Sequence, residues 1–211
     1  PMERQSNVLR DKSLAFEGAV SLEETKAGIR PWRLPFPEIS LFSPSVAVRS
    51  GQPSGVRISF CSDTREIMLM VEPPANPEVL AGPDAVWVWD LLADGQRVCR
   101  VSQPSRIPVI KLSIPDAATC HKDRWLEIFL PSSYLPATIC ELRIDACASL
   151  SAVTDYRPRL VTYGSSITQA KEAAGPSETW PAIVADRRKM HLTNLGFGGN
   201  EHLEAGVARV I

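Results

Sequence analysis

The sequence lacks three features that mark large classes of proteins. No uninterrupted apolar stretch approaches the roughly 20 residues that a membrane-spanning helix needs. No block of like charge is present and the formal net charge is −1, so no basic face is indicated that would bind nucleic-acid phosphates. The polar residues 1–13 contain no apolar core of a signal peptide. We therefore predict a cytoplasmic protein with neither a membrane nor a nucleic acid as partner, although Pro1 ahead of Met2 leaves a removed leader open.

Metal-binding and disulfide patterns are also missing. The five cysteines are scattered, odd in number and without C-x-x-C spacing, at Cys61, Cys99, Cys120, Cys140 and Cys147. This spacing favours buried free thiols in a reducing compartment over a disulfide. No Cys/His cluster has the spacing of zinc ligands, so we predict no metal site.

The composition is that of an ordinary globular protein, with 44% hydrophobic and 22% charged residues. A chain of 211 residues can form one large domain or two small ones. From about residue 14 to residue 150 the sequence consists of short β-branched or alternating runs broken by Pro, Gly, Asn and Asp. The runs are residues 55–60, 66–71, 86–89, 106–112, 125–130 and 139–144.

Period-two spacing places Leu69 and Val71 on one face of a strand, and Ile128 and Leu130 on one face of another. Asp94-Gly95 lies between Leu91-Leu92 and Val98 and predicts a type I′ hairpin turn, in which both central residues have positive φ. Repeated strands without helical periodicity predict a β-sandwich of the jelly-roll type over residues 1–157.

The pattern changes over residues 158–211, which we interpret as the beginning of a second domain. Residues 159–163 and 192–195 are short apolar strands. Between them, residues 179–188 predict a helix with Trp180, Ile183, Val184 and Arg187 along one side, and another helix is expected to begin near Glu201. This order is the opening of a parallel α/β sheet. Two strands cannot bury both faces of such a sheet, so we expect the chain to be a fragment of a longer protein.

The first candidate functional segment is YGSSITQ (163–169), which follows the first of these strands. A tight turn between a strand and a helix projects a serine side chain from the carboxyl edge of the sheet, where α/β proteins bind ligands. Gly164 permits the turn, and backbone N–H groups at the start of the helix can face developing negative charge. Taken alone, a Gly-Ser-Ser segment after a strand is more often an ordinary loop than an active site.

The second segment is NLGFGGN (194–200), at the end of the next strand. Its three glycines allow the backbone to approach a substrate and present an N–H group, and Asn200 adds a polar side chain. The structural alternative is a glycine-rich turn with an asparagine helix cap. In a parallel sheet both segments reach the same edge, which favours an active site.

Together, YGSSITQ, the WPAIVADR helix (180–187) and NLGFGGNEHLE (194–204) resemble SGNH hydrolases, the GDSL-like esterases and lipases. The likeness is to a bacterial subgroup in which a β-sandwich precedes the hydrolase domain, and residues 30–35, 55–60 and 90–95 resemble that sandwich. The resemblance implies that Ser166 is the nucleophile. It also implies that the N–H groups of Ser166 and Gly199 line the oxyanion hole, with Ser165 and Asn200 as candidate substrate contacts. Ser165 replaces the Asp of the GDS signature, and Ala170 stands where the family usually has Gly.

The family takes a third oxyanion donor, an Asn, from a later block, and its Asp and His from a D-x-x-H block, none of which lies within residues 1–211. Of the three histidines, His121 falls in the sandwich and His191 lies at the end of its strand opposite Ser166. His202 follows the glycine loop without matching the catalytic position.

The resemblance implies a serine esterase that needs no cofactor and acts on a small ester or an acylated carbohydrate, with the acetyl ester favoured. The present chain alone is expected to be inactive. A different hypothesis is a non-catalytic sandwich that binds carbohydrate or serves as a scaffold. Its stacking surface would be formed by tryptophans that otherwise fill the core, namely Trp32, Trp87, Trp89 and Trp125.

Overall fold

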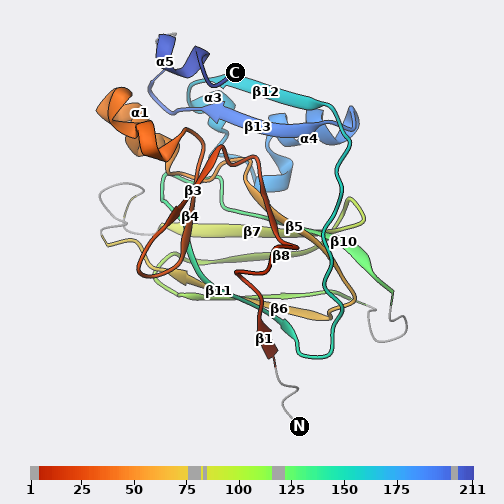
Figure 1. Ribbon diagram of the computed structural model, residues 1–211. Coiled ribbons are helices and arrows are strands. Elements are labelled where there is room, and N and C mark those ends of the chain that lie inside the picture. Colours follow the sequence, from red (N-terminus) through yellow and green to blue (C-terminus); the bar gives the residue numbers. More distant parts are fainter. Residues whose placement is uncertain (1–4, 76–81, 83–84, 116–121, 201–203) are drawn as a thin grey trace.

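The computed structural model describes residues 5–75, 82, 85–115, 122–200 and 204–211. Two antiparallel sheets form most of it, with a small parallel pair of strands above them (Figure 1). The strands of the first sheet, in spatial order, are β3 (Ser21–Glu24), β4 (Ile29–Trp32), β11 (Thr138–Asp145), β6 (Glu66–Glu72) and β9 (Val109–Ser113), and β1 (Gln5–Asn7) also pairs with β11. The strands of the second sheet are β2 (Ala15–Glu17), β5 (Arg57–Ser62), β10 (Arg124–Phe129), β7 (Val86–Ala93) and β8 (Gln96–Pro104).

The core of the sandwich is formed by alternate residues of both sheets, as the period-two pattern predicts. Leu69 and Val71 of β6 are fully buried, as are Ile128 of β10 and Leu130 just after it. Trp87 and Trp89 are also fully buried, and their rings meet edge to face with centroids 6.1 Å apart. These two tryptophans therefore fill the core and offer no surface for stacking.

The Asp94-Gly95 turn joins β7 to β8 as predicted. Its two central residues have φ values of 51° and 79°, and Ala93 pairs with Gln96 on either side of them. Positive φ at both positions is the geometry that this dipeptide favours.

The cysteines differ from the sequence prediction in one respect. The four that the structure describes are free thiols, as expected, but Cys61, Cys99 and Cys140 are only half-buried and Cys147 is exposed. Cys61, Cys99 and Cys140 lie in strands whose alternate residues fill the core, so the predicted burial was wrong. Cys120 lies outside the described residues.

The remaining elements confirm the predicted second part. They are the strands β12 (Arg159–Gly164) and β13 (His191–Gly196) with the helices α3 (Ser166–Gln169), η3 (Pro176–Glu178), α4 (Trp180–Arg187) and α5 (Ala205–Ala208), besides η1 (Phe36–Leu41) and α1 (Pro44–Ser50) in the sandwich portion. β12 and β13 pair in parallel from Arg159↔His191 to Gly164↔Gly196. The fold is thus an antiparallel β-rich unit followed by a short parallel α/β segment, whereas jelly-roll connectivity stays a prediction.

Helix α4 begins where the sequence indicates, because the hydroxyl of Thr179 accepts a hydrogen bond from the N–H of Ala182. The side of α4 that is buried carries Ala182 and Ala185, which pack against Phe129 of the sandwich and Leu192 of β13. The larger apolar residues on its other side are partly exposed. Among the described residues, none of the helices has the length and apolarity needed to cross a membrane.

Candidate active site

Ser166 is the first residue of α3, two residues after the end of β12, and it is exposed. A Cβ on Gly164 would lie 2.3 Å from the Thr168 hydroxyl oxygen, so the close packing of α3 over the strand end requires glycine there. The helix is only one turn long, and the residue that follows it, Ala170, has a left-handed φ of 59°. The sequence thus produces a serine on a tight strand-to-helix turn, as predicted.

The glycine loop follows β13 at the same edge. Phe197 N–H donates to the carbonyl of Gly164, the last residue of the neighbouring strand. Gly199 is exposed with a φ of 76°, and a Cβ built on it would meet no atom of the described part of the chain within 4 Å. Asn200 is buried, and its side-chain N–H donates to the carbonyl of Gly198 at 2.8 Å. The amide of Asn200 is therefore part of the framework of this loop.

Direct contacts join the two loops. The side-chain oxygen of Gln169 accepts a hydrogen bond from Gly198 N–H at 2.8 Å, and the side chain of Asn194 donates to Thr168 O at 2.9 Å. A Cβ on Gly196 would lie 2.3 Å from Gln169 N, so α3 packs directly on the end of β13. The segments that carry Ser166 and Gly199 are therefore adjacent at the carboxyl edge of the parallel pair.

Of the three histidines, the structure describes only His191, and this one lies away from the edge that carries Ser166. His191 begins β13 and pairs with Arg159, at the end of the strands away from Ser166, as the sequence predicts. Burial, together with the positive charge of Arg57, lowers the pKa of His191 to about 4, so its imidazole is neutral at pH 7. His121 and His202 lie outside the described residues.

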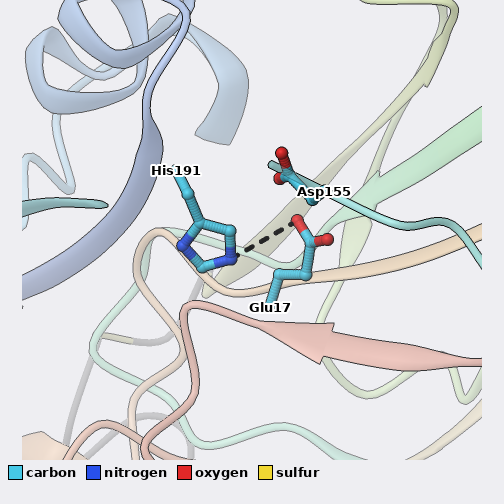
Figure 2. Close-up of side chains that lie close together, drawn as sticks. All are labelled: Glu17, Asp155 and His191. Carbon is cyan, nitrogen blue, oxygen red and sulfur yellow. Dashed lines mark ion pairs between the residues drawn. The ribbon is translucent and has the colours of Figure 1, made fainter. Parts of the chain in front are cut away.

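A second cluster of titratable groups surrounds His191, where Glu17, Asp155 and His191 point toward one another (Figure 2). One ligand atom of each lies within 4.8 Å of the others. Arg57 contacts the Glu17 carboxylate at 2.7 Å and Arg157 contacts that of Asp155 at 2.7 Å. Because each carboxylate already has a guanidinium partner, we interpret the cluster as an ion-pair network. The members of this cluster are far apart in the sequence, so no local sequence pattern predicts the cluster.

A cavity of about 310 Å³ lies beside this network, between α4 and the second sheet of the sandwich. Trp125, Phe129 and Leu192 form part of its apolar wall, and Arg57 and Arg157 contribute charged groups. It lies toward the beginning of β13, so it is separate from the edge that carries Ser166.

Three sandwich residues that the sequence did not identify contact the active-site loops, and all are fully buried or nearly so. Arg33 donates to the carbonyl of Gly196 at 2.5 Å, Gln52 accepts a hydrogen bond from the side chain of Gln169 at 2.7 Å, and Ser54 donates to Gln169 O at 2.6 Å. No spacing rule links positions so distant along the chain.

Comparisons with known proteins find matches to both parts of the chain. The sequence model for "SsfX3, N-terminal domain" matches residues 14–135, and that for the "GDSL-like Lipase/Acylhydrolase family" matches residues 157–211. No curated protein matches the chain.

Among solved structures, a salicylyl-acyltransferase named SsfX3, from a tetracycline biosynthetic pathway, is 29% identical with a TM-score of 0.84, covering 98% of this chain and 58% of that one. A GDSL-like lipase from Bacteroides ovatus is 18% identical with a TM-score of 0.70, covering 98% and 60%. An acetyl xylan esterase from Butyrivibrio proteoclasticus is 10% identical with a TM-score of 0.61, covering 93% and 49%. The chain thus spans less than two thirds of the length of each, and the last two show a likeness of fold alone.

Proposed function

The chain belongs to the family of the SsfX3 N-terminal domain, and on that premise we propose that it forms part of a serine esterase in which Ser166 is the nucleophile. The match of residues 157–211 to GDSL-like acylhydrolases supports this proposal. One observation carries it: an exposed serine on a strand-to-helix turn lies beside a glycine loop at the same edge of two parallel strands. We place the boundary between the sandwich and the hydrolase domain at 157/158.

In the proposed reaction, Ser166 Oγ attacks the ester carbonyl while a histidine outside residues 1–211 takes up its proton. The tetrahedral oxyanion accepts hydrogen bonds from Ser166 N–H and Gly199 N–H, and an Asn of the longer protein adds a third donor. The histidine then returns the proton to the leaving alcohol, and an acyl-enzyme remains on Ser166. The same histidine then takes a proton from a water molecule, whose oxygen attacks the acyl carbonyl. The bond to Ser166 Oγ breaks, the acid is released and the proton returns to Oγ.

The proposed substrate is a short-chain acyl ester, with an acetyl group on a carbohydrate favoured by the fold shared with an acetyl xylan esterase. Ser165 is half-buried immediately before the nucleophile, and we propose that it contacts substrate, as does the loop around Asn200. A second candidate acceptor in place of water is the hydroxyl group of another molecule, which the salicylyl-acyltransferase at 29% identity supports. Comparing hydrolysis with transfer to added alcohols would distinguish the two.

The test uses the full-length protein with p-nitrophenyl acetate as substrate. We expect Ser166→Ala to lower kcat by at least about 1,000-fold, because the acyl-enzyme can no longer form. Ser113→Ala is the matched control, since it removes an exposed hydroxyl at the end of β9, outside the proposed site, and should retain the turnover. Equal activity of Ser166→Ala and the wild type would overturn the proposal.

The same mechanism predicts that residues 1–211 alone have little or no esterase activity. Removing one oxyanion donor typically costs about 2.7–4 kcal/mol, and the general base would be missing as well. Brisk turnover by this chain that disappears in Ser166→Ala would contradict the proposed role of groups outside it.

The alternative in which the sandwich binds carbohydrate is less well supported, because Trp87 and Trp89 are in the core. A scaffolding role of the sandwich is favoured instead by the hydrogen bonds that join Arg33, Gln52 and Ser54 to the two loops.

A further inference from the structure

The side chain of Gln169 links the nucleophile turn to the glycine loop. Gln169 is fully buried three residues after Ser166, and its Oε1 accepts a hydrogen bond from Gly198 N–H at 2.8 Å. Its Nε2 donates to Gln52 Oε1 of the sandwich at 2.7 Å. Both ends of one carboxamide are thus occupied, one by the loop and the other by the sandwich.

Gln52 fixes the orientation of the Gln169 carboxamide. It is 1% exposed, and its own Nε2 donates to the carbonyl of Tyr134 at 2.8 Å, which leaves its Oε1 as the acceptor for Gln169. In this series of hydrogen bonds, each side-chain amide therefore has only one orientation in which its NH₂ group donates and its oxygen accepts. If the Gln169 amide were reversed, its NH₂ group would face Gly198 N–H, and two donors would be left unpaired in a buried place.

Arg33 holds the other side of the loop. It is fully buried, and its Nη1 donates to the carbonyls of Asn194 at 3.1 Å and Gly196 at 2.5 Å. Its guanidinium carbon lies 4.8 Å from the centroid of the Phe197 ring, and its Nε donates to Gln52 O at 2.5 Å. Among the described residues, its hydrogen-bond partners are backbone carbonyls, a use of the planar five-donor fork that no other side chain offers.

Hydrogen bonds to both peptides that flank Gly198 restrict the direction of the Gly199 N–H group. The Phe197–Gly198 peptide is held through Gly198 N–H, and the Gly198–Gly199 peptide is held through Gly198 O by Asn200. In a trans peptide the N–H points opposite to the C=O, so Gly199 N–H is directed away from Asn200. Among the residues that the structure describes, none has an atom within 4 Å of where a Cβ on Gly199 would be. Its orientation therefore depends on its neighbours.

We propose that Gln169 is a positioning residue, oriented by Gln52 and Arg33 of the sandwich, which holds Gly199 N–H where the oxyanion forms. The sandwich is then a structural part of the oxyanion hole rather than an attached module. This inference rests on the proposed function, because it assigns a role in the same site.

The kinetic test uses the full-length protein and p-nitrophenyl acetate. We expect Gln169→Met to lower kcat about 10- to 100-fold while KM changes less than about threefold, since the interaction aids the transition state more than substrate binding. Gln52→Met should act in the same direction without altering the nucleophile segment. It also serves as the second variant if Gln169→Met fails to fold. The matched control is Gln103→Met, because Gln103 bonds the carbonyls of Ile107 and Val109 far from the site.

A conservative variant, Gln169→Glu, gives a pH dependence of kcat that we would not expect if Gln169 had a purely structural role. In Gln169→Glu, a protonated carboxyl group can accept from Gly198 N–H and donate to Gln52, as the native amide does. Once ionised, it loses the donor. We expect the ratio of variant to wild-type kcat to fall as the pH rises from 5.5 to 8. A ratio that is independent of pH would count against the assigned geometry.

Amide hydrogen exchange tests the contact without relying on activity. In Gln169→Met, exchange at Gly198 N–H should accelerate at least about tenfold, while the amides of the sandwich core keep the wild-type rate. Unchanged exchange, or faster exchange with unchanged kcat, would overturn the positioning role. Absence of Ser166-dependent turnover in the wild type would instead overturn the proposed function, and with it the catalytic meaning of the Gln169 contact.

Discussion

Gly164 and Gly196 are register partners at the last positions of two parallel strands, and α3 packs on both. A Cβ on the first would meet the Thr168 side chain, and a Cβ on the second would meet the backbone of residues 168 and 169. Ser166 and Gly199 follow this pair by two and three residues. The two loops can therefore pack this closely only because Gly164 and Gly196 have no side chains.

Gly196→Ala should destabilise the full-length protein by about 1–3 kcal/mol and lower its activity. The added Cβ would lie 2.3 Å from Gln169 N and 2.6 Å from Thr168 C, and backbone atoms cannot swing aside. Urea unfolding measures the change. Gly51→Ala is the control, since its Cβ would only touch the Trp32 ring at 3.4 Å and its φ of −77° suits alanine. A Gly196→Ala protein as stable as the control would show that α3 can move away.

Ala170→Gly should raise the free energy of unfolding by about 0.5–1 kcal/mol. Ala170 has a φ of 59°, a left-handed conformation that costs a non-glycine residue about 1–2 kcal/mol, part of which is offset by the greater freedom of glycine in the unfolded chain. Ala47→Gly within α1 should instead lower the free energy of unfolding, because the backbone at Ala47 is helical and glycine disfavours a helix. Thermal unfolding of both variants tests the pair. Destabilisation by both would mean that the strain at Ala170 is relieved elsewhere.

Arg57→Met should destabilise the protein by about 3–5 kcal/mol. Arg57 is 2% exposed and contacts the carboxylates of Glu17 at 2.7 Å and Glu127 at 3.0 Å, so its removal leaves two buried acids without their nearest cation. In the exposed pair of Arg10 with Glu24, Arg10→Met should cost less than about 1 kcal/mol. Denaturant titration measures both, and similar losses would indicate that Arg157 can replace Arg57.

His191 should make the protein less stable in mild acid. Its pKa is about 4 in the folded chain and near 6.5 when unfolded, because burial and Arg57 disfavour the protonated ring. Between these values the unfolded chain binds a proton that the folded chain does not. The contribution of His191 to the free energy of unfolding therefore declines as the pH falls from 6.5 to 4, by at most about 3 kcal/mol.

The measurement is the free energy of unfolding of the wild type minus that of His191→Gln, followed over this pH range. Burial raises the pKa of Glu17, which acts in the opposite sense, and the subtraction removes most of that effect. A difference independent of pH would show that His191 titrates alike in both states.

Much of the fold follows from local sequence patterns. Period-two burial at Leu69 and Val71 and the Asp94-Gly95 turn are properties of a few neighbouring residues, so the sequence alone reveals them. The parallel pair was also predictable, because strand, turn and helix alternate after residue 158.

The parts that were missed depend on contacts between distant segments. Arg33 and Gly196 are 163 positions apart, and nothing in residues 30–35 shows that the second arginine turns inward while Arg30 remains half-exposed. The cysteine prediction failed for a related reason, because residue type favours burial while the alternation of each strand decides the face. The direction of Gln169 depends on Gln52 in the same way.

Two buried arginines of the sandwich also cover the edge of β13 that faces away from β12, where none of the described strands pairs with it. Arg33 bonds the carbonyls of Asn194 and Gly196, and Arg57 bonds that of Leu192 at 3.4 Å, all on the strand that has β12 on its other side. An uncovered edge of this kind invites pairing with another molecule. Replacing the sandwich with an unrelated domain would therefore expose the backbone hydrogen-bonding groups at this edge of β13 and favour self-association. This limits which domains could take the place of the sandwich during evolution.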